Sequence, residues 1–419
     1  MKYSFFILLF LSFSSWGQQK FELSAEFRPR MEQRLGYRTL APTDAKTAFF
    51  ISERFRLQSL YSTDQLKLLI SLQDYRVWGN EEQVKNIGSI GLHEGWAELR
   101  LKPNNFLKLG RQEISYEDNR LLGNLDWVQQ ARSHDGVVYK YVSPKTNFHL
   151  GSFFNQSAEQ ITGTVYKLNN YKSMSYAWYN QKLDSGRISL SYYAILDGLP
   201  NRDSIPKSYY RFTTGPNTSF KLDPITLNVG AYLQLGKTIS NQSIMAFFTN
   251  IYAEYAHRKT FFGLGYDFLS GNNAKSTDQT EYKAFHTLYP TNHKYYGHMD
   301  YFLDIPNDTK QGGLQDIYAR IQYKPNTKGL VGVDAHYFLL GNNVKSAVNP
   351  AQYLDPYLGV ELDFFGSYKA LDFMTINAGY SLMFASESMK EIKGGDNKRY
   401  NGWSFISLTL KPTLFQHIK

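Results

Sequence analysis

Residues 48–78 alternate between two kinds of side chain, and this alternation constrains the fold more than any other feature. Phe55 and Leu57 occupy odd positions, while Arg54 and Arg56 occupy even ones. Successive side chains of a strand point to opposite faces, so one face is apolar and the other carries two guanidinium groups. The stretch predicts two antiparallel strands joined by a short turn. Its apolar face would meet either the core of a soluble sandwich or membrane lipid, and its charged face either bulk water or a lumen.

The first residues have the pattern of a secretory signal peptide. Lys2 precedes an uncharged apolar run over residues 5–13, and small residues follow up to Gly17. The pattern predicts cleavage after Gly17, so that residues 1–17 are the signal peptide and residues 18–419 form one mature domain. The apolar run is too short to cross a bilayer as a helix. The chain has no cysteine, which excludes a lipid anchor on cysteine, a disulfide framework and a thiolate metal site.

The composition of the mature chain favours a membrane barrel. Mean hydropathy is −0.43, and no later stretch approaches the ~18 consecutive apolar residues of a membrane helix. The chain nevertheless contains 32 Tyr, 29 Phe and 6 Trp. Aromatic residues near strand ends are expected to form interfacial girdles, while the tyrosines of residues 285–302 are candidates for stacking on sugar rings. An exported, aromatic-rich chain of short alternating strands is typical of an outer-membrane β-barrel in contact with lipid.

The strand pattern predicts an all-β fold, a transmembrane antiparallel barrel of about 18 strands that acts as a monomer. Short turns alternate with long connections, of which residues 115–132 and 270–313 are the longest. Long connections of barrels lie on the external side or fold into the pore, so these two are expected to gate it. In the strand that follows the first turn, a register shift near Asp74 is predicted to return Asp74 and Arg76 to the lumen.

Positive charge is spread through the predicted strands rather than gathered in a tail. The formal net charge is +9. This distribution favours an anionic partner inside a cavity, and no recognisable module for nucleic acid is present. Arginine stays charged at any working pH and binds carboxylates bidentately. Ten arginines are predicted to line the pore and contact the transported molecule: Arg28, Arg30, Arg54, Arg56, Arg76, Arg100, Arg111, Arg120, Arg132 and Arg320.

The same arginines have a second interpretation. Many acidic residues lie near them in sequence, so they also fit a ladder of salt bridges that supports the barrel wall. The sequence leaves both interpretations open.

No catalytic, metal or cofactor site is predicted. Ser133, His134 and Asp135 are adjacent in sequence, but adjacent side chains point to different faces of a strand and do not form a triad. His293, His298 and Asp300 in the second long connection could ligate a metal, but their spacing fits no established zinc pattern. We therefore expect neither enzyme activity nor a cofactor.

Several longer stretches carry a resemblance to a known family. They are Arg54-Phe55-Arg56, SLQDYRVWG (71–79), LGRQEISYEDNRLLG (109–123), DWVQQARSHDG (126–136) and HKYYGHMDYF (293–302). Together they resemble the alginate-export family of outer-membrane porins. The resemblance implies a barrel of about 18 strands with a basic constriction, and passive passage of an acidic polysaccharide.

The expected function is therefore an outer-membrane channel through which an acidic oligo- or polysaccharide diffuses. Two alternatives stay open at this point. One is a general porin, or a porin for a different substrate. The other is a secreted, soluble β-sandwich that binds carbohydrate. The sequence does not indicate the direction of transport, the identity of the polymer or partners in the envelope.

Overall fold

The computed structural model describes residues 19–81, 89–164, 171–200, 208–277 and 280–419. Residues 1–18 lie outside this part, and with them the predicted signal peptide at residues 1–17. Within the described ranges, no helix combines the length and the apolar character that a membrane crossing requires.

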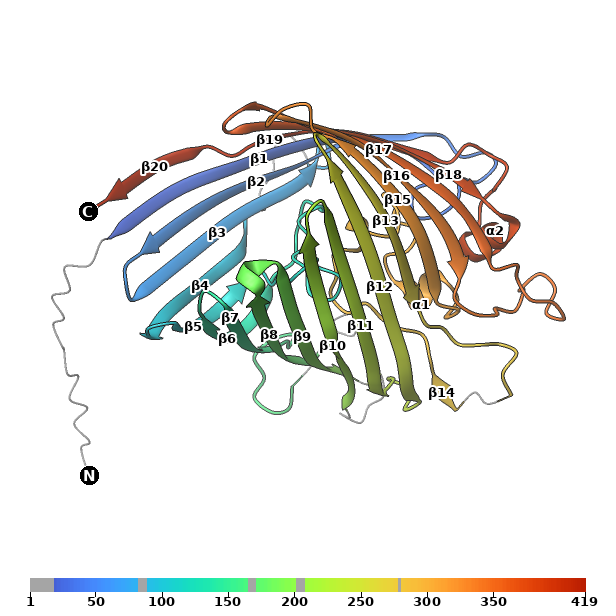
Figure 1. Cartoon of the computed structure of the whole chain (residues 1–419), viewed down its shortest axis with the longest axis horizontal. Coiled ribbons are helices and arrows are strands. Elements are labelled where there is room, and N and C mark those ends of the chain that lie inside the picture. Colours follow the sequence, from blue (N-terminus) through green and yellow to red (C-terminus); the bar gives the residue numbers. More distant parts are fainter. Residues whose placement is uncertain (1–18, 82–88, 165–170, 201–207, 278–279) are drawn as a thin grey trace.

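The described strands belong to a single sheet (Figure 1). Their bounds are β1 (Lys20–Leu35), β2 (Ala48–Ser62), β3 (Leu66–Val77), β4 (Gly91–Lys102), β5 (Asn105–Gln112), β6 (His134–Val142), β7 (Thr146–Phe154), β8 (Ser173–Leu183), β9 (Ile188–Pro200), β10 (Ser208–Leu222), β11 (Ile225–Lys237), β12 (Ser243–His257), β13 (Thr260–Leu269), β14 (Glu281–Tyr282), β15 (Leu314–Tyr323), β16 (Gly329–Leu340), β17 (Tyr357–Leu371), β18 (Met374–Ala385), β19 (Gly402–Leu410) and β20 (Thr413–Ile418). The connections contain four short helices: η1 (Asp184–Gly186), η2 (Asn292–Lys294), α1 (Ile305–Asp308) and α2 (Glu387–Lys393).

The sheet closes on itself. Each long strand pairs antiparallel with the next one along the chain, β13 pairs with β15 across the two-residue β14, and β1 pairs with β19. Strand β20 continues the path of β19 along the first residues of β1. Because β14 stands outside the ring and β19 and β20 share one position, 18 strands form the ring in the described part of the chain. The predicted barrel of about 18 strands is confirmed, and the soluble sandwich is excluded.

Alternation along β2 explains the two faces of the barrel. The Phe55 side chain is 47% exposed on the outside, whereas Arg54 and Arg56 are almost fully buried inside. Exposed apolar residues recur on the outer face of other strands, such as Leu264 and Ile406. A surface that is apolar outside and charged inside is the reverse of a soluble protein and fits a barrel surrounded by lipid. The predicted faces of residues 48–62 are therefore confirmed.

A register shift does occur near Asp74, between Ser71 and Leu72 where β3 pairs with β4, but its extra residue lies on β4. The prediction that Asp74 and Arg76 return to the lumen is wrong, because β2 and β3 pair without interruption, with Asp74 opposite Phe55 and Arg76 opposite Glu53. Residues directly opposite in an antiparallel pair point to the same face. Asp74 and Arg76 therefore lie on the outer face, where they line a shallow hollow with Phe55 and Leu72.

Candidate functional site

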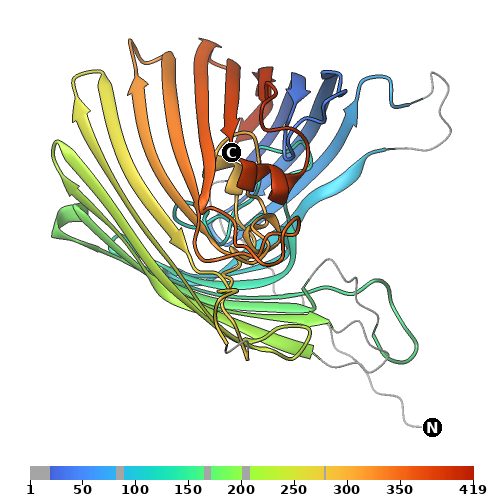
Figure 2. The same cartoon turned by 90° about the vertical axis from the view of Figure 1, so that its right-hand side faces the viewer.

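Two long connections fold into the interior of the barrel (Figure 2). The first, loop 113–133, joins β5 to β6, and the second, loop 283–313, joins β14 to β15. Their backbones bind each other: the N–H of Gly123 donates to the carbonyl of Tyr289 at 2.8 Å, and the N–H of Tyr289 donates to Leu121 at 3.0 Å. The rings of Trp127 and His293 stack with centroids 4.0 Å apart. The two loops therefore form one unit inside the lumen.

Arginines of β1 and β2 attach loop 113–133 to the wall. Arg28 donates from Nε to Oε1 of Gln129 at 3.1 Å. Arg30 donates to the Trp127 carbonyl at 2.7 Å and lies over the indole ring. Arg54 donates to Oδ1 of Asp126 at 2.8 Å. Because charge-assisted hydrogen bonds are stronger than neutral ones, these contacts fix the position of the loop.

The same loop reaches the opposite side of the barrel. Arg120 pairs with Asp267 of β13 and, at 3.0 Å, with Asp118 of its own loop. Glu117 accepts a hydrogen bond from Nε1 of Trp178 on β8 at 2.9 Å. Loop 113–133 thus crosses the lumen and is attached on both sides.

Loop 283–313 is attached through its backbone as well as its side chains. The N–H of Met299 donates to Oε1 of Glu361 on β17 at 2.7 Å, and the N–H of His298 donates to Asp363 at 3.2 Å. On the far wall, the Tyr289 hydroxyl donates to Oδ2 of Asp197 at 3.0 Å. The loop therefore spans from β17 to β9.

A cavity of about 580 Å³, here named the basic cavity, lies between the loops and strands β1 and β15–β19. Its aromatic residues include Trp127, His293, Phe365 and Phe405. The charged residues of its lining, histidines aside, are the cations Arg28, Arg30, Lys294, Arg320 and Lys411 and the carboxylates Asp126 and Asp334. Five cations face two carboxylates, so the lining carries an excess of positive charge.

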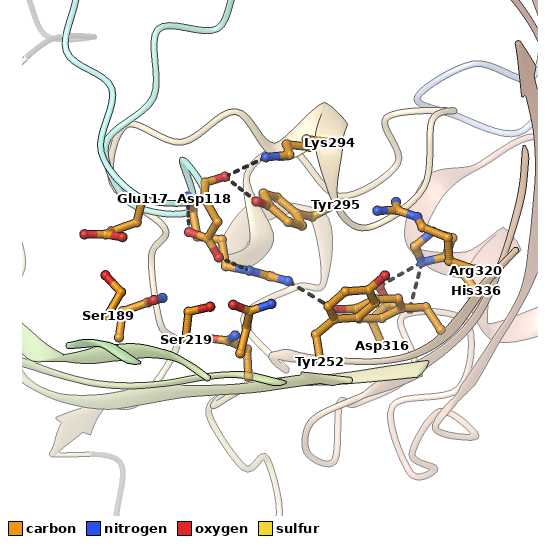
Figure 3. Close-up of a pocket in the computed structure, with 15 residues that line it drawn as sticks. Glu117, Asp118, Ser189, Ser219, Tyr252, Lys294, Tyr295, Asp316, Arg320 and His336 are labelled. Atoms are coloured by element: carbon orange, nitrogen blue, oxygen red, sulfur yellow. Dashed lines mark hydrogen bonds and ion pairs between the residues drawn. The ribbon is translucent and has the colours of Figure 1, made fainter. Parts of the chain in front are cut away.

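A second cavity of about 440 Å³, here named the amide cavity, lies against strands β9–β12, β15 and β16 (Figure 3). Figure 3 shows Glu117, Asp118 and Tyr295 of the loops on one side and Ser219 and Tyr252 of the strands on the other. The lining also contains Asn217, Asn228 and Asn250. Lys294 and Arg320 line both cavities and therefore mark the junction between them.

The environment sets the charges of the loop residues. Burial opposes the charge of Arg120, but Asp267, Asp118 and two tyrosines beside it together outweigh this effect, and the pKa of Arg120 is raised well above its usual value. Burial raises the pKa of Glu117. Desolvation by the surrounding walls lowers the pKa of Lys294, although Asp118 opposes the effect. Lys294 donates to the backbone carbonyl of Asp118 at 3.3 Å and forms no ion pair with a carboxylate in the described part of the chain.

The ten predicted arginines occupy different environments. Arg28, Arg30 and Arg320 line the basic cavity, and Arg120 and Arg320 line the amide cavity. Arg54 and Arg56 are buried beneath the loop, so their contacts fit the salt-bridge interpretation. Arg132 donates to the carbonyls of Gly123 and Pro290, and Arg100 is exposed near the turn that follows β4.

Two of the ten predicted positions are wrong. Arg76 lies on the outer face for the reason given above. Arg111 lies two positions after the outward Leu109 and therefore on the same face, and it pairs with Asp135 of β6 at 2.7 Å, where both side chains are exposed. Both arginines lie close to strand ends, where a charged side chain reaches past the apolar surface to water.

The sequence reasoning missed several residues that line the cavities. Lys294 and Lys411 belong to the basic cavity, and Ser219, Asn228 and Asn250 belong to the amide cavity. A signal was present for the last three, because polar residues recur at every second position in the centres of β10–β12. No such signal exists for Lys294, whose position depends on how two distant loops meet.

Histidines and carboxylates meet at several places in the described part of the chain, and the loops contribute to some of them. His293 and Asp300 bond to each other at 2.7 Å within loop 283–313. Among the described residues, one group of three offers metal-ligating atoms within 4.8 Å of one another: His93, Glu94 and Glu113. Its Glu113 carboxylate already accepts hydrogen bonds from His93 and Asn124, so these atoms are engaged in holding loop 113–133 to β4.

Comparison with known proteins identifies relatives of both sequence and fold. A family model described as alginate export matches residues 19–402. No curated protein matches the sequence. Among solved structures, OccAB1 of Acinetobacter baumannii has 14% identity and a TM-score of 0.64, covering 94% of this chain and 97% of its own. OccK3 (OpdO) of Pseudomonas aeruginosa has 11% identity and a TM-score of 0.62, with coverages of 94% and 96%.

OpdK of Pseudomonas aeruginosa, solved with vanillate, has 10% identity and a TM-score of 0.58, with coverages of 94% and 99%. At these identities the likeness shows that the fold is shared.

Proposed function

Because the chain belongs to the alginate export family, we propose that it is an outer-membrane channel through which an acidic oligo- or polysaccharide diffuses. The observation that supports this most directly is the excess of five cations over two carboxylates around the basic cavity. Charged side chains that line a pore select permeating ions by sign. A uronate unit would be attracted to this lining, whereas a cationic solute would be repelled.

The shape and chemistry of the basic cavity favour a short saccharide segment. Its volume of about 580 Å³ falls in the range of sites that hold small molecules. Phe365 offers apolar surface against which the ring of a sugar can pack, while Arg28 and Arg30 are placed to bind its carboxylate. Passage requires no covalent chemistry, so the proposed function is transport and not catalysis.

Part of the positive charge is already compensated, which suits a channel. Arg28 lies 3.4 Å from Asp126, and Lys411 lies 3.0 Å from Glu26. Lys294 is the cation of the basic cavity that no described carboxylate neutralises. Binding in a channel must be favourable enough for entry and weak enough for release. Partly compensated cations provide this balance.

A second candidate substrate is a small carboxylate. The basic cavity places aromatic rings beside cations in a confined volume, an arrangement that also fits a single aromatic acid. OpdK, which shares the fold, was solved with vanillate. The two candidate substrates can be separated by comparing how strongly an oligouronate and a small aromatic acid block the channel current.

The test is ion selectivity of the purified full chain in a planar bilayer. Reversal potentials in a KCl gradient would be compared for wild type, Arg28→Gln/Arg30→Gln and the control Arg111→Gln on the outer face. We expect anion-selective current that oligouronates block more strongly than benzoate, with both selectivity and block reduced in the double variant alone. A channel with unchanged selectivity in the double variant would refute the basic pore. Stronger block by benzoate would favour the second candidate.

A further inference from the structure

The strands behind the amide cavity bring small polar residues into register. In one tier, Ser189 of β9 lies opposite Ser219 of β10, which lies opposite Asn228 of β11. Asn228 in turn lies opposite Tyr252 of β12. Residues directly opposite in an antiparallel pair point to the same face, so these side chains form a continuous row on the lumen wall. Ser189, Ser219 and Tyr252 appear as part of this row in Figure 3.

A second tier runs parallel to the first. Asn217 of β10 lies opposite Gly230 of β11, and Gly230 lies opposite Asn250 of β12. A Cβ at Gly230 would come within 2.2 Å of Oδ1 of Asn250, so the glycine keeps the space in front of this amide open. The two tiers together present amides and hydroxyls on strands β9–β12.

Apart from Lys294, the cations of the amide cavity have carboxylate partners. Arg120 pairs with Asp118 and Asp267, and His336 approaches Asp316 at 2.9 Å. These pairs leave little charge for a ligand. The cavity therefore differs from the basic cavity, where cations outnumber carboxylates.

The neutral groups, in contrast, are available. Within the described ranges, the side chains of Ser219 and Asn228 have no hydrogen-bond partner. Asn250 is only 4% exposed, yet its Oδ1 accepts no hydrogen bond from a described residue. Buried polar atoms of folded proteins nearly always have a partner, either in the protein or in a bound molecule. The buried Asn250 oxygen without a partner thus indicates a site for a bound molecule, and the half-buried Ser219 and Asn228 beside it offer further free hydrogen-bonding groups.

We propose that the amide cavity binds an uncharged pyranose unit through Ser219 and Asn228 of the first tier and Asn250 of the second. A hydroxyl group both donates and accepts, as an amide does, and matches these side chains without requiring a charge. The proposal rests on the proposed function, because it specifies one component of the saccharide that passes through the lumen. Because Lys294 and Arg320 line both cavities, a saccharide across the junction places an uncharged unit in the amide cavity and an acidic unit in the basic cavity. The substrate is then a mixed neutral and acidic saccharide.

The test is equilibrium binding to the detergent-solubilised full chain, with maltotriose as an uncharged hexose oligomer. Titration calorimetry would compare wild type, Ser219→Ala/Asn228→Ala and the matched control Asn147→Ala/Thr226→Ala, which removes an amide and a hydroxyl outside both cavities. Each lost neutral hydrogen bond weakens binding by about fivefold, so we expect about 25-fold weaker binding for the first variant. The control should bind like wild type. Heat-modifiable mobility on gels verifies that each barrel is folded.

The outcomes separate this inference from the channel function. Absence of maltotriose binding to the folded wild type overturns the inference, and so does binding that the Ser219→Ala/Asn228→Ala variant leaves unchanged. If this double variant does not fold, the single Ser219→Ala variant decides, with about fivefold weaker binding expected. Binding in detergent needs no conductance, so a protein that binds maltotriose but conducts no ions would refute the channel function and retain the site.

Discussion

Replacing Arg120 by leucine should release loop 113–133 from the far wall of the barrel. The Arg120 side chain is 3% exposed and contacts the carboxylate of Asp267, which is fully buried. One oxygen of that carboxylate, Oδ1, already has no hydrogen-bond donor among the described residues. Arg120→Leu would remove the ion-pair partner of a fully buried carboxylate. Breaking one side of a buried ion pair costs about 3–5 kcal/mol.

This energy sets the size of the expected effect. Since about 1.4 kcal/mol is a factor of ten, the ratio of attached to released loop should fall by roughly a hundredfold to several thousandfold. The double variant Arg120→Leu/Asp267→Leu removes both charges, and replacing a buried pair by apolar residues is often close to neutral. We therefore expect the double variant to restore most of the attachment that the single variant loses.

Trypsin provides the assay, because Arg132 lies within the same loop and is bonded to the carbonyls of Gly123 and Pro290. Mass spectrometry would follow cleavage after Arg132 in wild type and in both variants, and single-channel recording would follow the conductance. The single variant should be cleaved faster and should conduct more. Equal cleavage rates and equal conductance in wild type and Arg120→Leu would contradict the reasoning, as would a double variant that behaves like the single one.

Three further predictions concern the lumen and the wall. Anion selectivity, measured as reversal potential, should decline as the pH rises into the alkaline range. The decline should begin below the usual pKa of lysine, because desolvation lowers the pKa of Lys294. Lys294→Met should remove this early part of the pH titration. Arg54→Met should lower the temperature at which gel mobility shifts, yet change selectivity less than Arg28→Gln does, because Arg54 is fully buried beneath the loop. Gly110→Ala should also lower the temperature of the gel-mobility shift, because Gly110 has a φ of +118° and a Cβ there would meet a backbone oxygen at 2.3 Å. The control Gly91→Ala should leave this temperature unchanged, because the space around Gly91 is open.

The fold was predictable because a barrel repeats one simple rule. Side chains alternate along a strand and the apolar set must face lipid, so the sequence of each strand in the ring indicates which face is outside. The same rule places Arg54 inside and Phe55 outside. It also places Arg111 outside with Leu109, and the prediction that Arg111 faces the lumen failed because charge was given more weight than alternation. The error at Asp74 was the same, because a charged side chain near a strand end can reach water from the outer face and does not have to point into the lumen.

The cavities were less predictable because they depend on contacts that alternation does not specify. Lys294 lines both cavities only because loops 113–133 and 283–313 bind each other. No pattern in the sequence of either loop predicts that it contacts the other. The arginines show the same limit. Arg28 and Arg54 are both inward-facing residues of neighbouring strands, yet one lines a cavity and the other is covered by Asp126 and Glu26. The position of loop 113–133 determines which of the two arginines is covered.

The seam between β1 and β19 has a consequence for assembly. Every other neighbouring pair of the ring is close in sequence or joined by one connection, but the seam pairs Phe27 with Leu410 and Lys20 with Ile418. Until β19 and β20 arrive, β1 and β18 are two open edges whose backbone groups lack partners, and such edges attract other chains. Ring closure brings together the most distant residues of the sheet, so it is the entropically most demanding step. A chain stalled before β19 should therefore be a species that depends on a chaperone to remain monomeric.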